Sequence, residues 1–131
     1  MPIANIAALR KFIPASQLAV IRSCVSGEEG SFFSAKLVEL SELIRGMPRI
    51  YEQDGQGKTA TAYLHYFCGG FDWYITERDT SESQLQAFGL EVRGSEAAPC
   101  YINLAALIAA GAELDLHFSP TTLEEIRAVP A

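Results

Sequence analysis

The chain has 131 residues, and a chain of this length buries roughly two thirds of its unfolded surface, so it can fold without disulfides or metals. Its composition, 49% hydrophobic and 20% charged, is globular and excludes a fibrous or disordered protein. The net charge of −6 argues against direct binding of phosphate backbones. The most apolar run, residues 104–112, is too short to span a bilayer, and no basic start precedes an apolar segment at the N-terminus. We therefore expect a cytoplasmic protein that does not bind membranes.

The three cysteines, Cys24, Cys68 and Cys100, lie far apart and form no Cys-x-x-Cys motif. An odd number at this spacing argues against a zinc site and against a disulfide framework. Each is expected to act as a small buried hydrophobic side chain. The sequence therefore predicts neither a metal nor a cofactor.

The charge is unevenly distributed along the chain. Residues 1–51 carry six basic and four acidic side chains, a net charge of +2, whereas residues 52–131 carry four basic and twelve acidic ones, a net charge of −8. An acidic C-terminal part is suited to a basic protein partner. Plain solubility is the alternative explanation.

The N-terminal part has the periodicity of helices. Apolar residues recur every three positions in residues 1–13, which indicates a short helix or turn before Pro14. Helices are predicted over Gln17–Ser26 and Ser31–Arg45, because apolar side chains gather on one face of each. Gly46 and Pro48 end the second of these.

The pattern then changes to that of strands. Thr59–Phe67 and Phe71–Arg78 are rich in aromatic and β-branched residues and flank Gly69-Gly70, which predicts a β-hairpin at the centre of a sheet. Leu85–Val92 is predicted to be a third long strand, with Gly89 at a bulge.

Shorter elements are expected around these strands. We predict short strands at Arg49–Gln53 and Tyr101–Ile102, a loop over Gly94–Pro99, and a helix over Leu104–Ala110 that Asn103 caps. Glu113–Phe118 alternates strictly and is predicted to be a strand. The last helix is expected to begin with a capping box of either Thr121 and Glu124 or Thr122 and Glu125.

This order of elements predicts an α+β fold: N-terminal helices, then a mainly antiparallel sheet of four to five strands, then helix–strand–helix at the C-terminus. We expect residues 1–131 to form a single domain, with a helical part over residues 1–48 and a sheet part over residues 49–131.

Four segments resemble a family of small bacterial proteins that is known only as a domain of unknown function and is common on plasmids and integrative elements. These segments are residues 50–58, 71–79, 87–92 and 113–126, so the resemblance lies within residues 49–126 and leaves the helical part unmatched. The resemblance implies the α+β fold and a mobile-element context. It implies no activity and no catalytic residue.

The first candidate site is the run that ends in Gly57-Lys58-Thr59, which resembles the end of a phosphate-binding loop. The first glycine of that motif would have to stand where Glu52 is, and a strand is expected to follow where the motif needs a helix. We therefore interpret the run as a glycine-rich connection.

A second candidate is the carboxylate group Asp72, Glu77 and Asp79. Two acids can divide acid and base roles when burial separates their pKa values. On an extended strand Glu77 and Asp79 share the face of Trp73, which would place Glu77 at the edge of the apolar face. Ion pairing with a nearby arginine, or simple exposure, explains the same residues.

The two histidines form a third candidate. His65 is expected on the face of Tyr63 and Phe67, and His117 on the face of Asp115 and Glu113. An Asp-x-His pair can orient an imidazole or bind a divalent metal, but two strand residues do not make a metal site. A solvated strand face is the alternative.

The fourth candidate is the aromatic content of the sheet. Tyr63, Tyr66, Trp73 and Tyr74 cannot all face one core, and Tyr74 should point away from Trp73. An open tyrosine-rich face suits protein contacts, because rigid rings supply contact area at low entropic cost. Helices on both faces would instead bury these rings.

No catalytic constellation is visible, so we expect a non-enzymatic accessory protein of a bacterial mobile genetic element that acts by binding another protein. A small enzyme or ligand-binding protein with a carboxylate and histidine pocket on the sheet is the alternative. Nucleic-acid binding by basic residues of the helical part is a weaker third possibility. The sequence does not indicate the oligomeric state. The candidate binding residues are Tyr63, His65, Asp72, Tyr74, Glu77, Asp79, Asp115 and His117.

Overall fold

The computed structural model describes residues 6–49, 53, 56–78 and 86–128. The chain separates into two compact units, Met1–Gly46 and Met47–Ala131. This division falls close to the predicted boundary between the helical and the sheet part. Whether the two units behave as one domain stays a prediction.

The first unit contains three helices, α1 (Ile6–Phe12), α2 (Ala15–Cys24) and α3 (Gly30–Gly46). The two shorter helices both pack against α3. Helix α3 begins at Gly30, where a Cβ atom would overlap the carbonyl oxygen of Val25, so the close approach of the two segments requires glycine. Most of the periodic apolar residues are buried as predicted, namely Leu9, Phe12, Leu18, Ile21, Leu37, Leu40 and Ile44, whereas Val25 and Phe33 are half-buried and Val20 is exposed.

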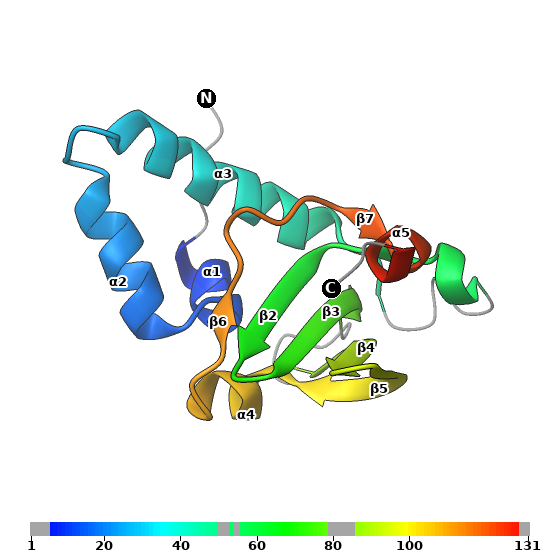
Figure 1. Cartoon of the computed structure of the whole chain (residues 1–131). Helices are drawn as coiled ribbons and strands as arrows, with labels where there is room; N and C mark the ends of the chain where they lie inside the picture. Colours follow the sequence, from blue (N-terminus) through cyan, green and yellow to red (C-terminus); the bar gives the residue numbers. More distant parts are fainter. Residues whose placement is uncertain (1–5, 50–52, 54–55, 79–85, 129–131) are drawn as a thin grey trace. The chain divides into compact units, whose positions relative to one another are not determined.

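The second unit is built on a five-stranded antiparallel sheet with the strand order β5-β4-β3-β2-β6 (Figure 1). Together with the helices this is an α+β fold, as predicted. The strands are β2 (Leu64–Cys68), β3 (Phe71–Arg78), β4 (Gln86–Arg93), β5 (Glu96–Asn103) and β6 (Glu113–Leu114).

The predicted hairpin is confirmed as β2 and β3. Gly69 turns the chain between them with a φ of 58°, a conformation that glycine adopts without strain. The predicted strand over Thr59–Phe67 is divided, however. Its beginning forms the 3-10 helix η1 (Gly57–Thr59) and the short strand β1 (Thr61–Ala62) before β2 starts. The glycine-rich run therefore leads into a strand, as expected.

A smaller two-stranded sheet joins β1 to β7 (Thr121–Thr122). Helix α5 (Leu123–Ala128) follows β7 and packs against η1. The amide of Glu125 donates a hydrogen bond of 3.2 Å to the hydroxyl of Thr122, so the second of the two predicted capping pairs is the one present.

Two sequence predictions about strands are wrong. Residues 96–99 were expected in a loop, but β5 runs from Glu96 to Asn103, because Gly94 forms a tight turn and β4 offers an edge for pairing. Glu113–Phe118 was expected to be one strand, but β6 ends at Leu114 because Asp115 starts a turn. Arg49 forms an isolated bridge with Arg78, and residues 50–52 of the strand predicted there lie outside the described residues.

Helix α4 (Leu104–Ala109) is capped by Asn103, whose side-chain oxygen accepts a hydrogen bond of 3.0 Å from the amide of Ala106. We predict that Asn103→Ala lowers the free energy of unfolding by about 1 kcal/mol, because this amide loses its acceptor. Urea denaturation followed by the fluorescence of Trp73 measures the change. Asn103→Asp keeps the acceptor and serves as the control, and an equal loss in both variants would contradict a capping role.

Within the described part of the chain, no helix combines the length and the apolar character that crossing a bilayer requires.

Candidate binding face around His65

Strand register places two rows of side chains on one face of the large sheet. His65 lies opposite Tyr74 on β3, and the amide of Asp115 donates to the carbonyl of His65 on the other side. In the neighbouring row Phe67 lies between Asp72 on β3 and Glu113 on β6. We call this set the histidine face: His65, Phe67, Asp72, Tyr74, Glu113 and Asp115.

His65 lies between two carboxylates. Its Nε2 is 2.7 Å from Oδ1 of Asp72, and its Nδ1 is 3.0 Å from Oδ2 of Asp115. Ionised carboxylates only accept hydrogen bonds, so both contacts are hydrogen bonds only when both ring nitrogens carry a proton. The geometry therefore fits an imidazolium held by two acids.

Aromatic rings surround the imidazole. Tyr74 stacks on it with a centroid distance of 4.5 Å and an interplanar angle of 7°. The ring centroids of Phe67 and Phe118 each lie 5.8 Å from that of His65, and the centroids of Phe118 and Tyr74 are 5.9 Å apart. Ring faces attract a cation, so they add to the stabilisation of the charged imidazole.

The position of Asp115 follows from its own turn. Its Oδ1 accepts a hydrogen bond of 2.9 Å from the amide of His117, which is the pattern of an Asx turn. The turn reverses the alternation expected from the sequence, so Phe118 reaches the histidine face and His117 is exposed.

The pKa of Asp115 lies below its ordinary value. Burial raises this pKa. The hydrogen bonds from the imidazole of His65 and the amide of His117, together with the charges of both histidines, lower it by more than burial raises it. Asp115 therefore stays ionised to a lower pH than a free aspartate.

The acidic and aromatic groups of this face reach solvent more than the cation does. The side chain of His65 is 14% exposed, against 38% for Asp72 and 29% for Asp115. Phe67 is 38% exposed, and Glu113 is exposed as well. The exposed surface of this face is thus acidic and aromatic.

Of the eight candidate residues, the structure brings together His65, Asp72, Tyr74 and Asp115. Tyr63 lies between β1 and β2, half-buried, and its amide donates to the carbonyl of Ile75. His117 was expected to share a face with Asp115, and the turn at Asp115 overturns this expectation. Asp79 lies outside the described residues.

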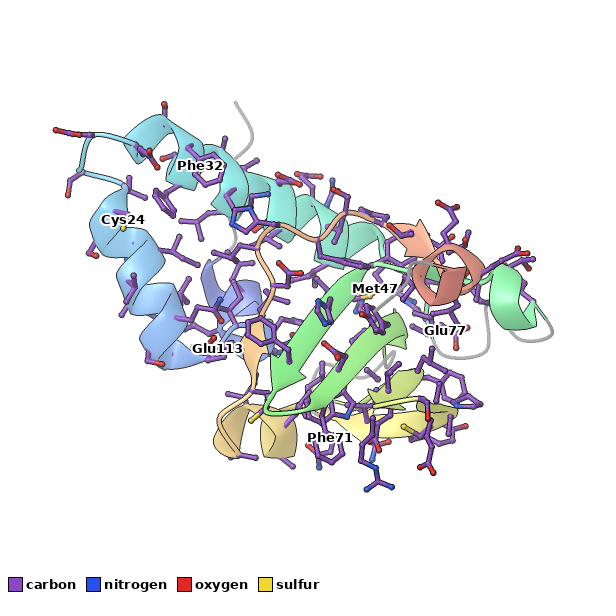
Figure 2. The ribbon with its side chains drawn as sticks, in the orientation of Figure 1. Cys24, Phe32, Met47, Phe71, Glu77 and Glu113 are labelled. Carbon is purple, nitrogen blue, oxygen red and sulfur yellow. The ribbon has the colours of Figure 1, made fainter. Side chains whose placement is uncertain are left out.

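Glu77 does not join this cluster. The β3–β4 register shifts between Ile75 and Glu77, so the alternation assumed for the sequence breaks there. Glu77 is 4% exposed and accepts a hydrogen bond of 2.6 Å from the amide of Gln53. Asp72 is five residues away, about 16 Å along the strand, so the two acids are not a catalytic pair. Figure 2 labels Glu77 and Phe71 towards the two ends of β3.

Gln53 was missed by the sequence analysis. Its Nε2 donates to the carbonyls of Thr61 and Thr76 at 2.9 and 2.8 Å, and its Oε1 accepts from the amide of Thr61 at 2.7 Å. The side chain of Gln53 thereby links the backbone of β1 to that of β3. No sequence signal marks this role.

The opposite face of the sheet carries Tyr66 and Trp73, which lie opposite one another across β2 and β3. Trp73 therefore points away from Tyr74, as predicted. Its Nε1 donates a hydrogen bond of 3.0 Å to Glu91, and its ring stacks on Phe71 at 5.7 Å. Tyr66 is fully buried, and burial raises the pKa of its phenol far above the ordinary range.

Among the described residues, no group of three or more histidine, cysteine, aspartate or glutamate side chains is placed to hold a metal ion.

Comparison with known proteins gives no match to a family model, to a curated protein or to a solved structure. The resemblance to the mobile-element family therefore stays an expectation.

Proposed function

We propose that this protein acts by binding another protein through the histidine face, and not as a catalyst. The observation that carries the proposal is the placement of both ring nitrogens of His65 against carboxylates. A general base needs an imidazole nitrogen with a free lone pair, and a metal ligand needs the same. While both ring nitrogens donate to these carboxylates, neither offers a lone pair.

The chemistry of the surface favours a basic partner. Asp72, Glu113 and Asp115 place three carboxylates on one face, and the single imidazole of His65 can offset at most one of their charges. Phe67 adds an exposed ring between two of these acids. Lysine and arginine side chains pair with carboxylates and pack over aromatic rings, so a segment rich in them complements this surface.

The accessory role on a bacterial mobile element is part of the same proposal, and it is supported by the sequence resemblance alone. Such a protein would meet its partner in the cytoplasm. The identity of the partner protein is left to experiment.

We predict that Glu113→Lys and Phe67→Ala each weaken partner binding by about tenfold or more, which corresponds to about 1.4 kcal/mol. The first variant places a cation on the histidine face, where it repels the basic partner, and the second removes the exposed ring. Affinity capture from nuclease-treated bacterial lysate with quantitative mass spectrometry identifies the partner, and titration of the purified pair measures the affinity.

Glu28→Lys is the matched control, because Glu28 is exposed on the helical unit and the change in net charge is the same as in Glu113→Lys. If Glu28→Lys weakens binding as much as Glu113→Lys does, the loss of affinity would be due to the change in net charge and not to the histidine face. Binding that survives both variants of the histidine face would refute the proposed surface.

A small-molecule role is the second candidate, because a carboxylate-oriented imidazole beside a tyrosine is also an arrangement found in ligand sites. A thermal-shift screen separates the two functions. A small molecule that stabilises the wild-type protein and has no effect on His65→Gln would favour this second function.

A further inference from the structure

We propose that His65 is a proton-controlled latch that fastens the turn Asp115–Phe118 onto the sheet. The imidazolium holds the turn closed, and loss of one proton releases it. The inference goes beyond the proposed function, because it concerns the isolated chain and requires no partner.

The two carboxylates that hold His65 are anchored very differently. Asp72 lies within the eight-residue strand β3, which is paired with β2 on one side and with β4 on the other. Asp115 follows the two-residue strand β6 at the edge of the sheet and begins a turn. When one contact must be given up, the contact to Asp115 is therefore the one that yields.

Acidic and aromatic groups surround the ring. Asp72 and Tyr74 face His65 from β3, Asp115 faces it from the turn, and Glu113 lies on the same face of β6. Leu90 and Val92, which extend the two rows on β4, are uncharged. The other histidine, His117, acts on Asp115.

A neutral imidazole keeps one N–H and turns a lone pair towards the other carboxylate, so an attraction becomes a repulsion. Histidine side chains change charge between about pH 5 and pH 8. The latch is therefore closed while both ring nitrogens of His65 carry a proton, and it opens when one of these protons is lost.

Asp115 sets the acid limit of the latch. The hydrogen bond from His65 and the other contacts of Asp115 outweigh burial and lower its pKa. The stabilisation that this carboxylate gives to the folded state is therefore fully present above the unfolded-state pKa of about 3.9. It is lost only as the pH falls through the lowered folded-state pKa. The turn is thus held most firmly between these two limits.

Release of the turn would alter the histidine face directly. Phe118 reaches His65 and Tyr74 only because the turn at Asp115 directs it there. An open turn would withdraw that ring and expose the carboxylate of Asp115. Proton uptake by His65 would in this way control the shape and the charge of the proposed binding surface.

Nuclear magnetic resonance on the isolated protein between about pH 5 and pH 8 tests the latch. The ¹⁵N shifts of the imidazole show which ring nitrogens carry protons, and nuclear Overhauser effects from Phe118 to the rings of His65 and Tyr74 show whether the turn is closed. We expect both ring nitrogens to be protonated while these effects are strong, and the effects to be lost as one proton leaves.

Two variants make the result specific. His117→Gln removes the only other histidine and should keep the transition. Asp115→Asn should abolish the transition, because a neutral amide can accept from a protonated ring nitrogen or donate to an unprotonated one. Overhauser effects that persist after His65 has lost a proton would overturn the latch, and so would an unchanged transition in Asp115→Asn. Neither result depends on a partner, so failure of the latch and failure of the binding proposal are distinguishable.

Discussion

Gly89→Ala is expected to lower the free energy of unfolding by about 3 kcal/mol or to prevent folding of the sheet. Gly89 pairs with Ile75 where the register of β3 and β4 shifts. A Cβ atom there would overlap the carbonyl oxygen of Tyr74 and lie 2.9 Å from its carbonyl carbon and 3.0 Å from Cα of Ile75. These are backbone atoms, so no side-chain rotation relieves the overlap.

Gly70→Ala is the matched control. An alanine there would meet no atom within 4 Å, and the backbone of Gly70 is not left-handed. Its effect should stay within about 0.5 kcal/mol. Urea denaturation followed by Trp73 fluorescence compares the two variants. A Gly89→Ala protein as stable as Gly70→Ala would show that the two strands do not approach as closely as described.

Tyr66→Ala is expected to cost about 3–5 kcal/mol, the range found for removal of a buried aromatic ring. Tyr66 is fully buried in β2 and lies between Trp73 on β3 and Leu114 on β6. The alanine leaves a cavity that three strands border. The histidine face lies on the other side of the sheet, so this loss tests the core and not the binding surface.

Tyr66→Phe separates the ring from its hydroxyl. We expect it to retain most of the stability, because the ring still fills its place, with a loss of about 1 kcal/mol for removal of the buried hydroxyl. The same denaturation measurement applies. A loss in Tyr66→Phe as large as in Tyr66→Ala would show that the hydroxyl, and not the packing of the ring, decides the stability here.

Local patterns predicted the long elements well, because each of them follows its own periodicity. The hairpin of β2 and β3 and the strand β4 alternate between two faces, and α3 carries a continuous apolar stripe. Of strand β5 only Tyr101–Ile102 was found in this way. Its first residues contain alanine and proline, which are weak strand formers, so pairing with β4 decides the outcome there.

The candidate site was predictable in its parts but not in its assembly. His65, Asp72, Tyr74 and Asp115 were named from strand faces. His65 and Asp115 are 50 residues apart in the sequence, and they meet only because β6 pairs with β2. Local periodicity does not encode the order of the strands, so this contact could not be predicted. Phe118 was assigned to the wrong side because alternation was extended past the turn that Asp115 begins.

The signal for that turn was present in the sequence. Aspartate is a residue type that begins Asx turns, and Ser119-Pro120 lies four positions after Asp115, so the two together favour a turn over a continuing strand. The register shift at Ile75 had a weaker signal in Gly89, which the sequence analysis placed at a bulge. That shift separates Glu77 from the histidine face.

Hydrogen–deuterium exchange of the captured complex tests the central claim most directly, because it shows which surface the partner covers. The account predicts slower exchange over β2, β6 and the turn Asp115–Phe118 when the partner is bound, and the same slowing in Glu28→Lys. Slower exchange confined to the helical unit, with β2 and β6 unchanged, would contradict binding through the histidine face.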